Sequence, residues 1–387
     1  MRPMQYFLVT SFMIALSACQ PEAQETDSVE SPSTTQQTRY LYVATGVCYS
    51  GTGNTTYTAA TASNIIFRVN LETGVYEGRV ADFTKATEAS GTTPVSITDY
   101  DSTRLMVLLE HTGQRRIELI EKKISGERQT FYNNTSTTAP MGILQSVGRF
   151  LTTAPDGFLL SRTTAIEKMD LGKSRRTGYG TSAWVNLPGG ACAGTTVNIT
   201  SLQTYPTTTT TAGYNIIYTH SMNASNATNN RIGVISGDTG WNGTTGCLDD
   251  QASVAATAYP TNSAYMGAFK RLAVSYAGTN ASLQNSIHTY AVDDTATSNI
   301  ISDTVNSYEN PSVIYGASTM AWDETNGYLY VATGGSIATN FTTGNVPYNI
   351  EKFSYDPTTK KFTRANNTTF YPGNLETRCI SSMFIGN

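Results

Sequence analysis

Short apolar segments alternate with polar turns over most of this chain, and no helical spacing dominates. The clearest apolar segment is Tyr-Leu-Tyr-Val-Ala-Thr-Gly, which occurs at 40–46 and again, identically, at 328–334. A polar loop follows each copy, and then a second segment that alternates between apolar and polar residues, at 65–74 and 349–356. This alternation is typical of half-buried strands. The pattern therefore predicts paired strands near both ends of the chain.

Weaker copies of the first segment lie between these two. The copies begin near Tyr40, Arg104, Phe158, Tyr214, Arg271 and Tyr328, in steps of 64, 54, 56, 57 and 57 residues. The tripeptide Asn-Ala-Ser also recurs 57 residues apart, at 223–225 and 280–282. A period of this length with short strands predicts an all-β fold, a β-propeller. Six copies favour six blades; seven blades, with one copy unrecognised and a period of about 48, remain the alternative.

The last repeat shows the expected four strands of one blade. They cover 318–322, the strand from Tyr328, 349–355 and 361–364, with a turn at 323–327. The first repeat lacks an innermost strand, but Ser381-Ser382-Met383 near the C-terminus matches Ser318-Thr319-Met320. We therefore expect the C-terminal strand to pair with the N-terminal blade and close the ring, which removes open sheet edges.

Turn residues of this repeat are expected to be structural. Asp101 and Asp156 precede their strands much as Asp323 does. Aspartates in such turns accept hydrogen bonds from their own backbone. The first long strand and the one after it resemble the YVTN-type propeller repeat, most clearly in the first and last blades. That resemblance implies an architecture and no particular activity.

The N-terminus has the pattern of a bacterial lipoprotein. An apolar run at 6–16 follows Arg2; it is shorter than the roughly 20 residues that span a bilayer and is typical of a signal peptide. Leu16-Ser17-Ala18-Cys19 resembles the lipobox, which implies cleavage before Cys19 and lipidation there. Gln20 then implies the outer membrane of a Gram-negative cell, on either face. An ordinary secretory peptide is the alternative.

The chain as a whole divides into three parts. We expect a signal peptide at 1–18, a lipidated cysteine with a disordered tether at 19–38, and a propeller domain at 39–387. Charged residues make up only 14%, against about 25% in typical proteins. The net charge of −4 gives no reason to expect nucleic acid.

Four cysteines remain besides Cys19, and an oxidising compartment favours two disulfides with three pairings open. Cys48 follows the end of the 40–46 strand and Cys379 begins the closing strand. Since these strands are antiparallel neighbours, we expect a Cys48–Cys379 disulfide. Cys192–Cys247 then follows by elimination.

Catalytic chemistry has little support in the sequence. His111 and His220 each end a predicted strand, and such a pair could bind metal or act as a base. No third ligand has usable spacing, His288 lies apart, and no known catalytic motif occurs. We therefore predict no catalytic residues, no metal and no cofactor, and consider an enzyme less favoured.

Four long, nearly uncharged loops are the best candidates for binding. They cover 48–57, 221–230, 278–284 and 334–344, and should form one arc on one face of a six-bladed ring. Long loops on a rigid scaffold often carry binding sites, although these could be tolerated insertions. Aromatic rings and amides in the loops suit a glycan or neutral peptide; the candidates are Tyr49, Tyr57, Phe341, Asn223 and Asn280.

These observations lead to two main hypotheses. The first is a membrane-anchored lipoprotein whose propeller binds a protein, peptide or glycan. The alternative is a hydrolase, lactonase or lyase with its site at the channel mouth, which rests on fold-level analogy; a structural envelope component is a third. Three or more His, Asp or Glu side chains in the channel would favour an enzyme. A channel of Ser, Thr and apolar groups would favour binding.

Overall fold

The computed structural model divides the chain into two units, Met1–Gln37 and Thr38–Asn387, and its described residues lie in the second. The structure describes residues 38–48, 58–59, 63–84, 92–111, 114–134, 147–150, 157–161, 165–170, 185–186, 197–211, 213–222, 231–237, 247–251, 258–278, 283, 285–314, 317–334 and 348–387. No helix within these ranges is long and apolar enough to cross a membrane.

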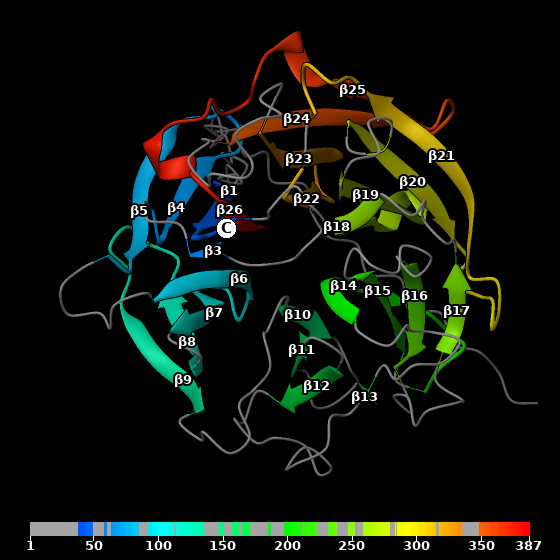
Figure 1. Cartoon of the computed structure of the whole chain (residues 1–387), viewed down its shortest axis with the longest axis horizontal. Helices are drawn as coiled ribbons and strands as arrows, with labels where there is room; N and C mark the ends of the chain where they lie inside the picture. The colour runs from blue at the N-terminus through cyan, green and yellow to red at the C-terminus, as the bar shows by residue number, and fades with distance from the viewer. Residues whose placement is uncertain are drawn as a thin grey trace, which may run out of the picture. The chain divides into compact units, whose positions relative to one another are not determined.

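The described residues form six four-stranded antiparallel sheets (Figure 1). The first three, each from its innermost to its outermost strand, are β26 (Ile380–Gly386), β1 (Tyr40–Thr45), β4 (Ile65–Asn70) and β5 (Tyr76–Asp82); β6 (Thr93–Asp99), β7 (Arg104–His111), β8 (Gln114–Glu121) and β9 (Arg128–Asn134); and β10 (Val147–Phe150), β11 (Gly157–Ser161), β12 (Ala165–Asp170) and β13 (Val185–Asn186).

The remaining three sheets follow in the same order. They are β14 (Val197–Pro206), β15 (Tyr214–Met222), β16 (Arg231–Ser236) and β17 (Cys247–Gln251); β18 (Ala258–Met266), β19 (Arg271–Gly278), β20 (Ser286–Val292) and β21 (Ile301–Glu309); and β22 (Thr319–Asp323), β23 (Tyr328–Thr333), β24 (Asn349–Asp356) and β25 (Lys361–Arg364). We call them the first to the last sheet. A small ladder, β2 (Val47–Cys48) with β3 (Thr58–Ala59), and the 3-10 helices η2 (Gly267–Phe269), η3 (Ala365–Asn367) and η4 (Leu375–Thr377) complete the described elements.

The innermost strands contact one another in a closed order, β26, β6, β10, β14, β18, β22 and back to β26. Figure 1 shows them around a common centre, with the later strands of each sheet farther out. The fold is therefore an all-β propeller, as the sequence predicts. Five second strands begin at the predicted residues Tyr40, Arg104, Tyr214, Arg271 and Tyr328, and β11 begins one residue before Phe158.

The C-terminal strand supplies the inner strand of the first sheet, as predicted. Met383 pairs with Val43 and Ser382 with Ala44 across β26 and β1. In the last sheet, Met320 pairs with Val331 and Thr319 with Ala332 across β22 and β23. The two ladders have the same register, so the repeated heptapeptide is paired in the same way at both ends of the chain.

The repeated heptapeptide is nearly all apolar because both faces of its strand are buried. Leu41 and Val43 pack toward the last sheet, against residues such as Tyr330 and Ile350. Tyr42 and Ala44 pack toward the second sheet, against residues such as Leu105 and Val107. A strand between two neighbouring sheets therefore has a continuous apolar run where a one-sided strand would alternate.

The predicted turn aspartates are structural where they are described. Asp101 accepts hydrogen bonds from the amides of Thr103 and Arg104, each at 2.8 Å. Asp323 accepts from the amides of Thr325 and Asn326 at 3.0 and 3.2 Å. Gly327 ends that turn with a φ of 70°, which favours glycine. Asp156 lies outside the described residues.

Candidate functional site

A cavity of about 310 Å³ lies where the inner strands converge. It receives side chains from β6, β14, β18, β22 and β26, five strands that surround the centre of Figure 1. Its described lining is Ser96, Ile97, Thr98, Ser201, Leu202, Gln203, Thr204, Asn262, Ala264, Tyr265, Thr319, Met320, Ala321, Trp322, Ser381, Ser382, Met383, Phe384 and Ile385. We call this cavity the channel.

Hydroxyl groups connect neighbouring sheets near the start of these strands. The ladders shift register at the bulged residues Thr200, Thr261 and Ser381. A β-bulge redirects a side chain, and each hydroxyl here donates to a carbonyl in or just before the inner strand of the next sheet. The acceptors are Pro260 at 2.8 Å, Ala317 at 2.7 Å and Pro94 at 2.8 Å.

The residue after each bulge adds a second contact to the next sheet. Ser201 Oγ lies 2.6 Å from Ser263 Oγ. The Met320 amide donates to Asn262 Oδ1 at 3.3 Å, and the Ile97 amide donates to Ser382 Oγ at 3.2 Å. We call these two rows the hydroxyl belt. Each bond contributes only about 0.5–1.5 kcal/mol, so the belt's main effect is to align the strands around a polar end of the channel.

Three aromatic residues, Tyr265, Trp322 and Phe384, line the other end of the channel, which we call the aromatic mouth. They come from the inner strands of three successive sheets. Tyr265 and Trp322 occupy the same register position, opposite Leu272 and Leu329. Phe384 lies one position earlier, opposite Tyr42. All three rings are half-buried, so each keeps some surface for a ligand.

Hydrogen bonds orient the Trp322 ring at this mouth. Its Nε1 donates to the Glu324 carboxylate at 2.6 Å. The same carboxylate accepts from the amides of Gly267 at 3.0 Å and Ala268 at 2.6 Å. Burial, together with the negative charges of Asp294 and Glu324, raises the pKa of Tyr265 to about 12. Tyr265 is therefore a neutral hydrogen-bonding ring at ordinary pH.

The described lining of the channel carries no Asp, Glu, His, Lys, Arg or Cys. Tyr265 is its one titratable side chain, and its raised pKa makes it a poor base near pH 7. Within the described ranges, no group of three His, Cys, Asp or Glu side chains could hold a metal ion. These side chains can stack on a ligand and exchange neutral hydrogen bonds with it.

The loop residues predicted to bind a ligand, Tyr49, Tyr57, Phe341, Asn223 and Asn280, lie outside the described residues, as do Cys19 and Cys192. His111 ends β7 and His220 lies in β15, while their side chains are not described. His288 is half-buried in β20, away from the channel lining. Burial lowers its pKa. The structure thus tests neither the predicted loop site nor the less favoured interpretation of His111 and His220 as a pair.

The backbone brings the predicted disulfide partners into one region. The Gly46 amide donates to the Cys379 carbonyl at 2.9 Å, and β2, which ends at Cys48, contacts β26. Cys379 takes part in a disulfide bond. The Cys48 side chain is not described, so its pairing with Cys379 stays a prediction. Cys247 begins β17, and the Cys192–Cys247 pairing also stays a prediction.

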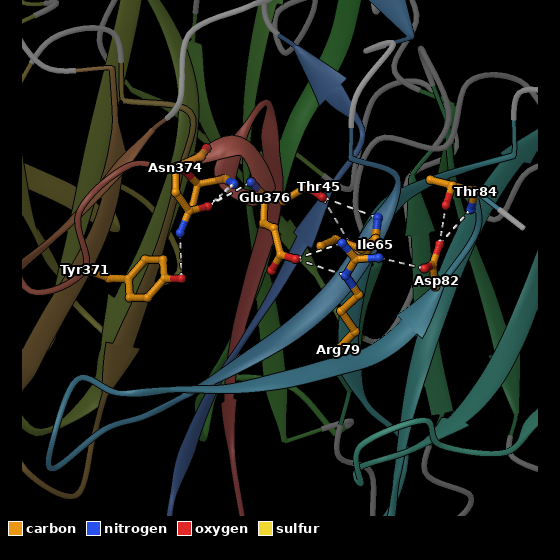
Figure 2. Close-up of polar contacts among 9 residues, drawn as sticks. Thr45, Ile65, Arg79, Asp82, Thr84, Tyr371, Asn374 and Glu376 are labelled. Carbon is orange, nitrogen blue, oxygen red and sulfur yellow. Dashed lines mark hydrogen bonds and ion pairs between the residues drawn. The ribbon is translucent and has the colours of Figure 1, made fainter.

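The segment before β26 is held against the first sheet (Figure 2). Glu376 accepts hydrogen bonds from Arg79 Nε at 3.0 Å and Nη2 at 2.8 Å, and Arg79 also binds Asp82 at 2.8 Å. Asn374 caps η4 and donates to the Tyr371 hydroxyl at 2.8 Å. These contacts orient β26 and thereby one wall of the channel.

Neither the hydroxyl belt nor the aromatic mouth was predicted from the sequence. A signal for the belt exists, because a Ser or Thr followed by a small polar residue recurs at 200–201, 261–262, 318–319 and 381–382, although the Ser318 hydroxyl has no hydrogen-bond partner among the described residues. Only the last two pairs were recognised. The mouth has a weaker local signal, because Tyr265 and Trp322 each lie four residues after the first member of their pair, whereas Phe384 lies three residues after it.

Comparisons with known proteins find similarity at the level of solved structures. No protein-family model and no curated protein matches the chain. It is similar to a candidate 6-phosphogluconolactonase from Bacteroides uniformis, with 13% identity, a TM-score of 0.47 and coverage of 85% of this chain and 82% of that one. It is also similar to a chain of the mitotic checkpoint complex, with 14% identity, a TM-score of 0.45 and coverage of 97% and 93%.

A third similar structure is a β-propeller domain from Myceliophteria thermophila, with 10% identity, a TM-score of 0.40 and coverage of 71% of this chain and 75% of that domain. At these identities and TM-scores the comparisons carry no argument about activity. The assignment of the fold rests on the strand pairing described above.

Proposed function

We propose that this propeller is a binding protein that receives an uncharged polar ligand, the end of a neutral glycan or a neutral peptide, at the aromatic mouth. The observation that carries the proposal is the described lining, which combines three half-buried rings with neutral hydroxyl and amide groups and no charge. Apolar surface with a few placed polar groups is typical of ligand sites. By the criterion stated above, this lining favours binding over catalysis.

The chemistry of the mouth selects against anionic ligands. A buried ionic group costs several kcal/mol unless it is paired, and the described lining offers no counter-ion. Trp322 and Tyr265 offer flat faces that suit a sugar ring or a small side chain. Gln203, Thr98 and Thr204 carry groups that can donate and accept hydrogen bonds. Neutral sugars and uncharged peptides match this set.

The enzyme alternative needs groups that the described lining lacks. Hydrolase, lactonase or lyase chemistry calls for an acid, a base or a metal at the reacting bond. That alternative therefore has fold-level analogy as its support. Mass spectrometry of each bound ligand after prolonged incubation distinguishes the two, because a binding protein returns the ligand unchanged.

Calorimetry with a panel of neutral oligosaccharides, uronic-acid oligosaccharides and uncharged peptides tests the proposal. We expect saturable binding of a neutral member and weaker binding of its charged counterparts. Trp322→Ala should weaken that binding about 30-fold, since central aromatic contacts contribute about 2 kcal/mol or more. Val75→Ala, at an exposed residue, is the control. Unchanged binding by a folded Trp322→Ala protein would contradict the proposal.

We propose further that the chain acts while lipid-anchored at the outer membrane. The support is the sequence alone, the apolar run at 6–16 and the lipobox-like Leu16–Cys19. Cys19→Ala should release the protein from the membrane fraction or leave it unprocessed. Mass spectrometry of the mature N-terminus would identify the lipid, and unchanged membrane retention of Cys19→Ala would refute the anchor.

A further inference from the structure

A second cavity, of about 250 Å³, lies away from the channel, at the junction of the last and first sheets. Lys352 of β24 and Phe370 line one side of it. The turn Glu72–Gly74, between β4 and β5, contributes the other sheet's residues. Asn366 and Thr368 add exposed polar side chains. We call this cavity the junction cavity.

Lys352 has an unusual environment within this cavity. Its Nζ lies 4.0 Å from the centroid of the Tyr328 ring and 5.6 Å from those of Tyr330 and Phe370. Across the described part of the chain, no hydrogen bond or ion pair to this ammonium occurs. Cation–π contacts offset part of the cost of burial, but they leave the donor capacity of the ammonium unused.

The first sheet contains a matched position where the cation has both an ion-pair partner and a carbonyl partner. Lys352 lies opposite Tyr330, and Arg68 lies opposite Tyr42, the same residue of the repeated heptapeptide. Arg68 also lies over an aromatic ring, 4.1 Å from the centroid of Tyr40.

The two cations differ in their partners. Arg68 binds Glu77 at 2.9 Å and the carbonyl of Lys122 at 2.8 Å. Lys122 belongs to the turn between the third and fourth strands of the neighbouring sheet. The equivalent turn beside Lys352 is Glu72–Gly74, between the third and fourth strands of the first sheet. This turn and Lys352 line the junction cavity, which occupies the position that the Lys122 carbonyl has beside Arg68.

We propose that the junction cavity binds a small, singly charged carboxylate with Lys352 as its counter-ion. A carboxylate would supply Lys352 with a negative charge, as Glu77 does for Arg68, and with an acceptor oxygen, as the backbone carbonyl of Lys122 does for Arg68. Asn366 and Thr368 can donate further hydrogen bonds to it. The lone cation and the carboxylate of Glu72 on the cavity wall disfavour a multiply charged phosphate or sulfate.

The electrostatics of Lys352 agree with this assignment. Burial lowers the pKa of Lys352, and Asp323 acts in the opposite direction. Asp323 is already bound to Arg39 and lies in its own turn. An anion beside Lys352 would therefore stabilise an ammonium that the protein itself leaves without a close counter-charge.

Ligand-observed ¹⁹F NMR with trifluoroacetate, at constant ionic strength, tests the proposal. We expect saturable binding that acetate displaces and that acetamide, its uncharged analogue, does not. Lys352→Met should weaken binding at least tenfold. Lys123→Met, which removes the same charge at a side chain that is 60% exposed, should bind as the unmodified protein does.

A second variant covers the case in which Lys352→Met fails to fold. Asn366 is exposed and has a φ of 55°, a conformation that aspartate tolerates. Asn366→Asp places a carboxylate at the cavity and should abolish trifluoroacetate binding. The proposal is overturned if the unmodified protein shows no saturable binding, if acetamide competes as well as acetate, or if a folded Lys352→Met or Asn366→Asp protein binds normally. Displacement by phosphate at lower concentration than acetate would overturn the singly charged class.

Discussion

The first and last sheets contain the same heptapeptide in the same register, yet they are assembled differently. The last sheet uses four consecutive strands, β22 to β25, whereas the first takes its inner strand from the C-terminus. Equal pairing in both shows that register depends on the strand faces and their burial. Continuity of the chain is not required for it. Because the inner strand of the first sheet is not continuous in sequence with its other three strands, contacts outside the strand ladder must help to hold it in place.

Ion pairs supply part of that connection. Arg39, just before β1, binds Asp323 of the last sheet at 2.5 Å, and the Asp323 side chain is fully buried. Arg79 binds Glu376 at 2.8 Å and so ties the first sheet to the segment that leads into β26. Both pairs join residues that are far apart in sequence, so they act on closure of the ring and little on any single sheet.

Deleting Ile380–Asn387 should have the largest effect on this comparison. The deletion removes the inner strand of the first sheet, including the buried Ile380 and Met383, and leaves the other sheets their own strands. Because a domain is stable by only about 5–15 kcal/mol, we expect loss of cooperative unfolding, measured by circular dichroism in urea. Adding the peptide 378–387 should partly restore it. A cooperative transition in the truncated protein alone would show that closure is dispensable.

Breaking the predicted Cys48–Cys379 disulfide should have the next largest effect. It would close a loop of about 330 residues, and the chain-entropy account gives a contribution of a few kcal/mol. The last sheet has no cysteine at the matching positions, Ser336 and Gly316. Cys48→Ala, Cys379→Ala and the double variant should all lose about the same stability, since each removes one bond. Additive losses, or free thiols at both residues in peptide mapping, would contradict the pairing.

Removing the two matched cations should give unequal losses. Arg68→Met breaks the bonds to Glu77 and the Lys122 carbonyl, and charged hydrogen bonds of this kind contribute about 1.5–3 kcal/mol. Lys352→Met removes only contacts with rings and should change stability by less than about 1 kcal/mol in carboxylate-free buffer. Urea denaturation of both variants measures this difference. A loss at Lys352 as large as that at Arg68 would reveal a protein partner for Lys352.

The same two sheets show what the sequence could predict. The strand starts and the closing strand followed from Tyr40–Gly46 and Ser381–Met383, because burial on both faces gives a local apolar signature. The aromatic mouth did not follow, because Tyr265, Trp322 and Phe384 line one cavity only once the sheets are arranged in a ring. The junction cavity was also out of reach. Arg68 and Lys352 are both cations in the strand that follows the heptapeptide. Whether a backbone carbonyl reaches the cation depends on a turn in the neighbouring sheet, which the local sequence does not show.

The smallest expected difference concerns one paired position. Val43 lies opposite Phe67 in the first sheet, while Val331 lies opposite Glu351 in the last. Glu351 is almost fully buried and binds Arg364 at 2.7 Å. Burial raises the pKa of Glu351, although Arg364 and Thr369 lower it in part.

An acid whose pKa is higher in the folded state costs stability as pH rises from its unfolded value through its folded value, because the unfolded chain releases the proton first. The Glu351 contribution is therefore most favourable below about pH 4.3, the ordinary value for glutamate, and declines above it. Urea denaturation of the unmodified protein and of Glu351→Gln at several pH values tests this, since other groups cancel in the difference. Relative to the variant, the unmodified protein should lose stability as pH rises from 4 toward neutrality. A gain over that interval would mean that the bonds to Arg364 and Thr369 outweigh burial at Glu351.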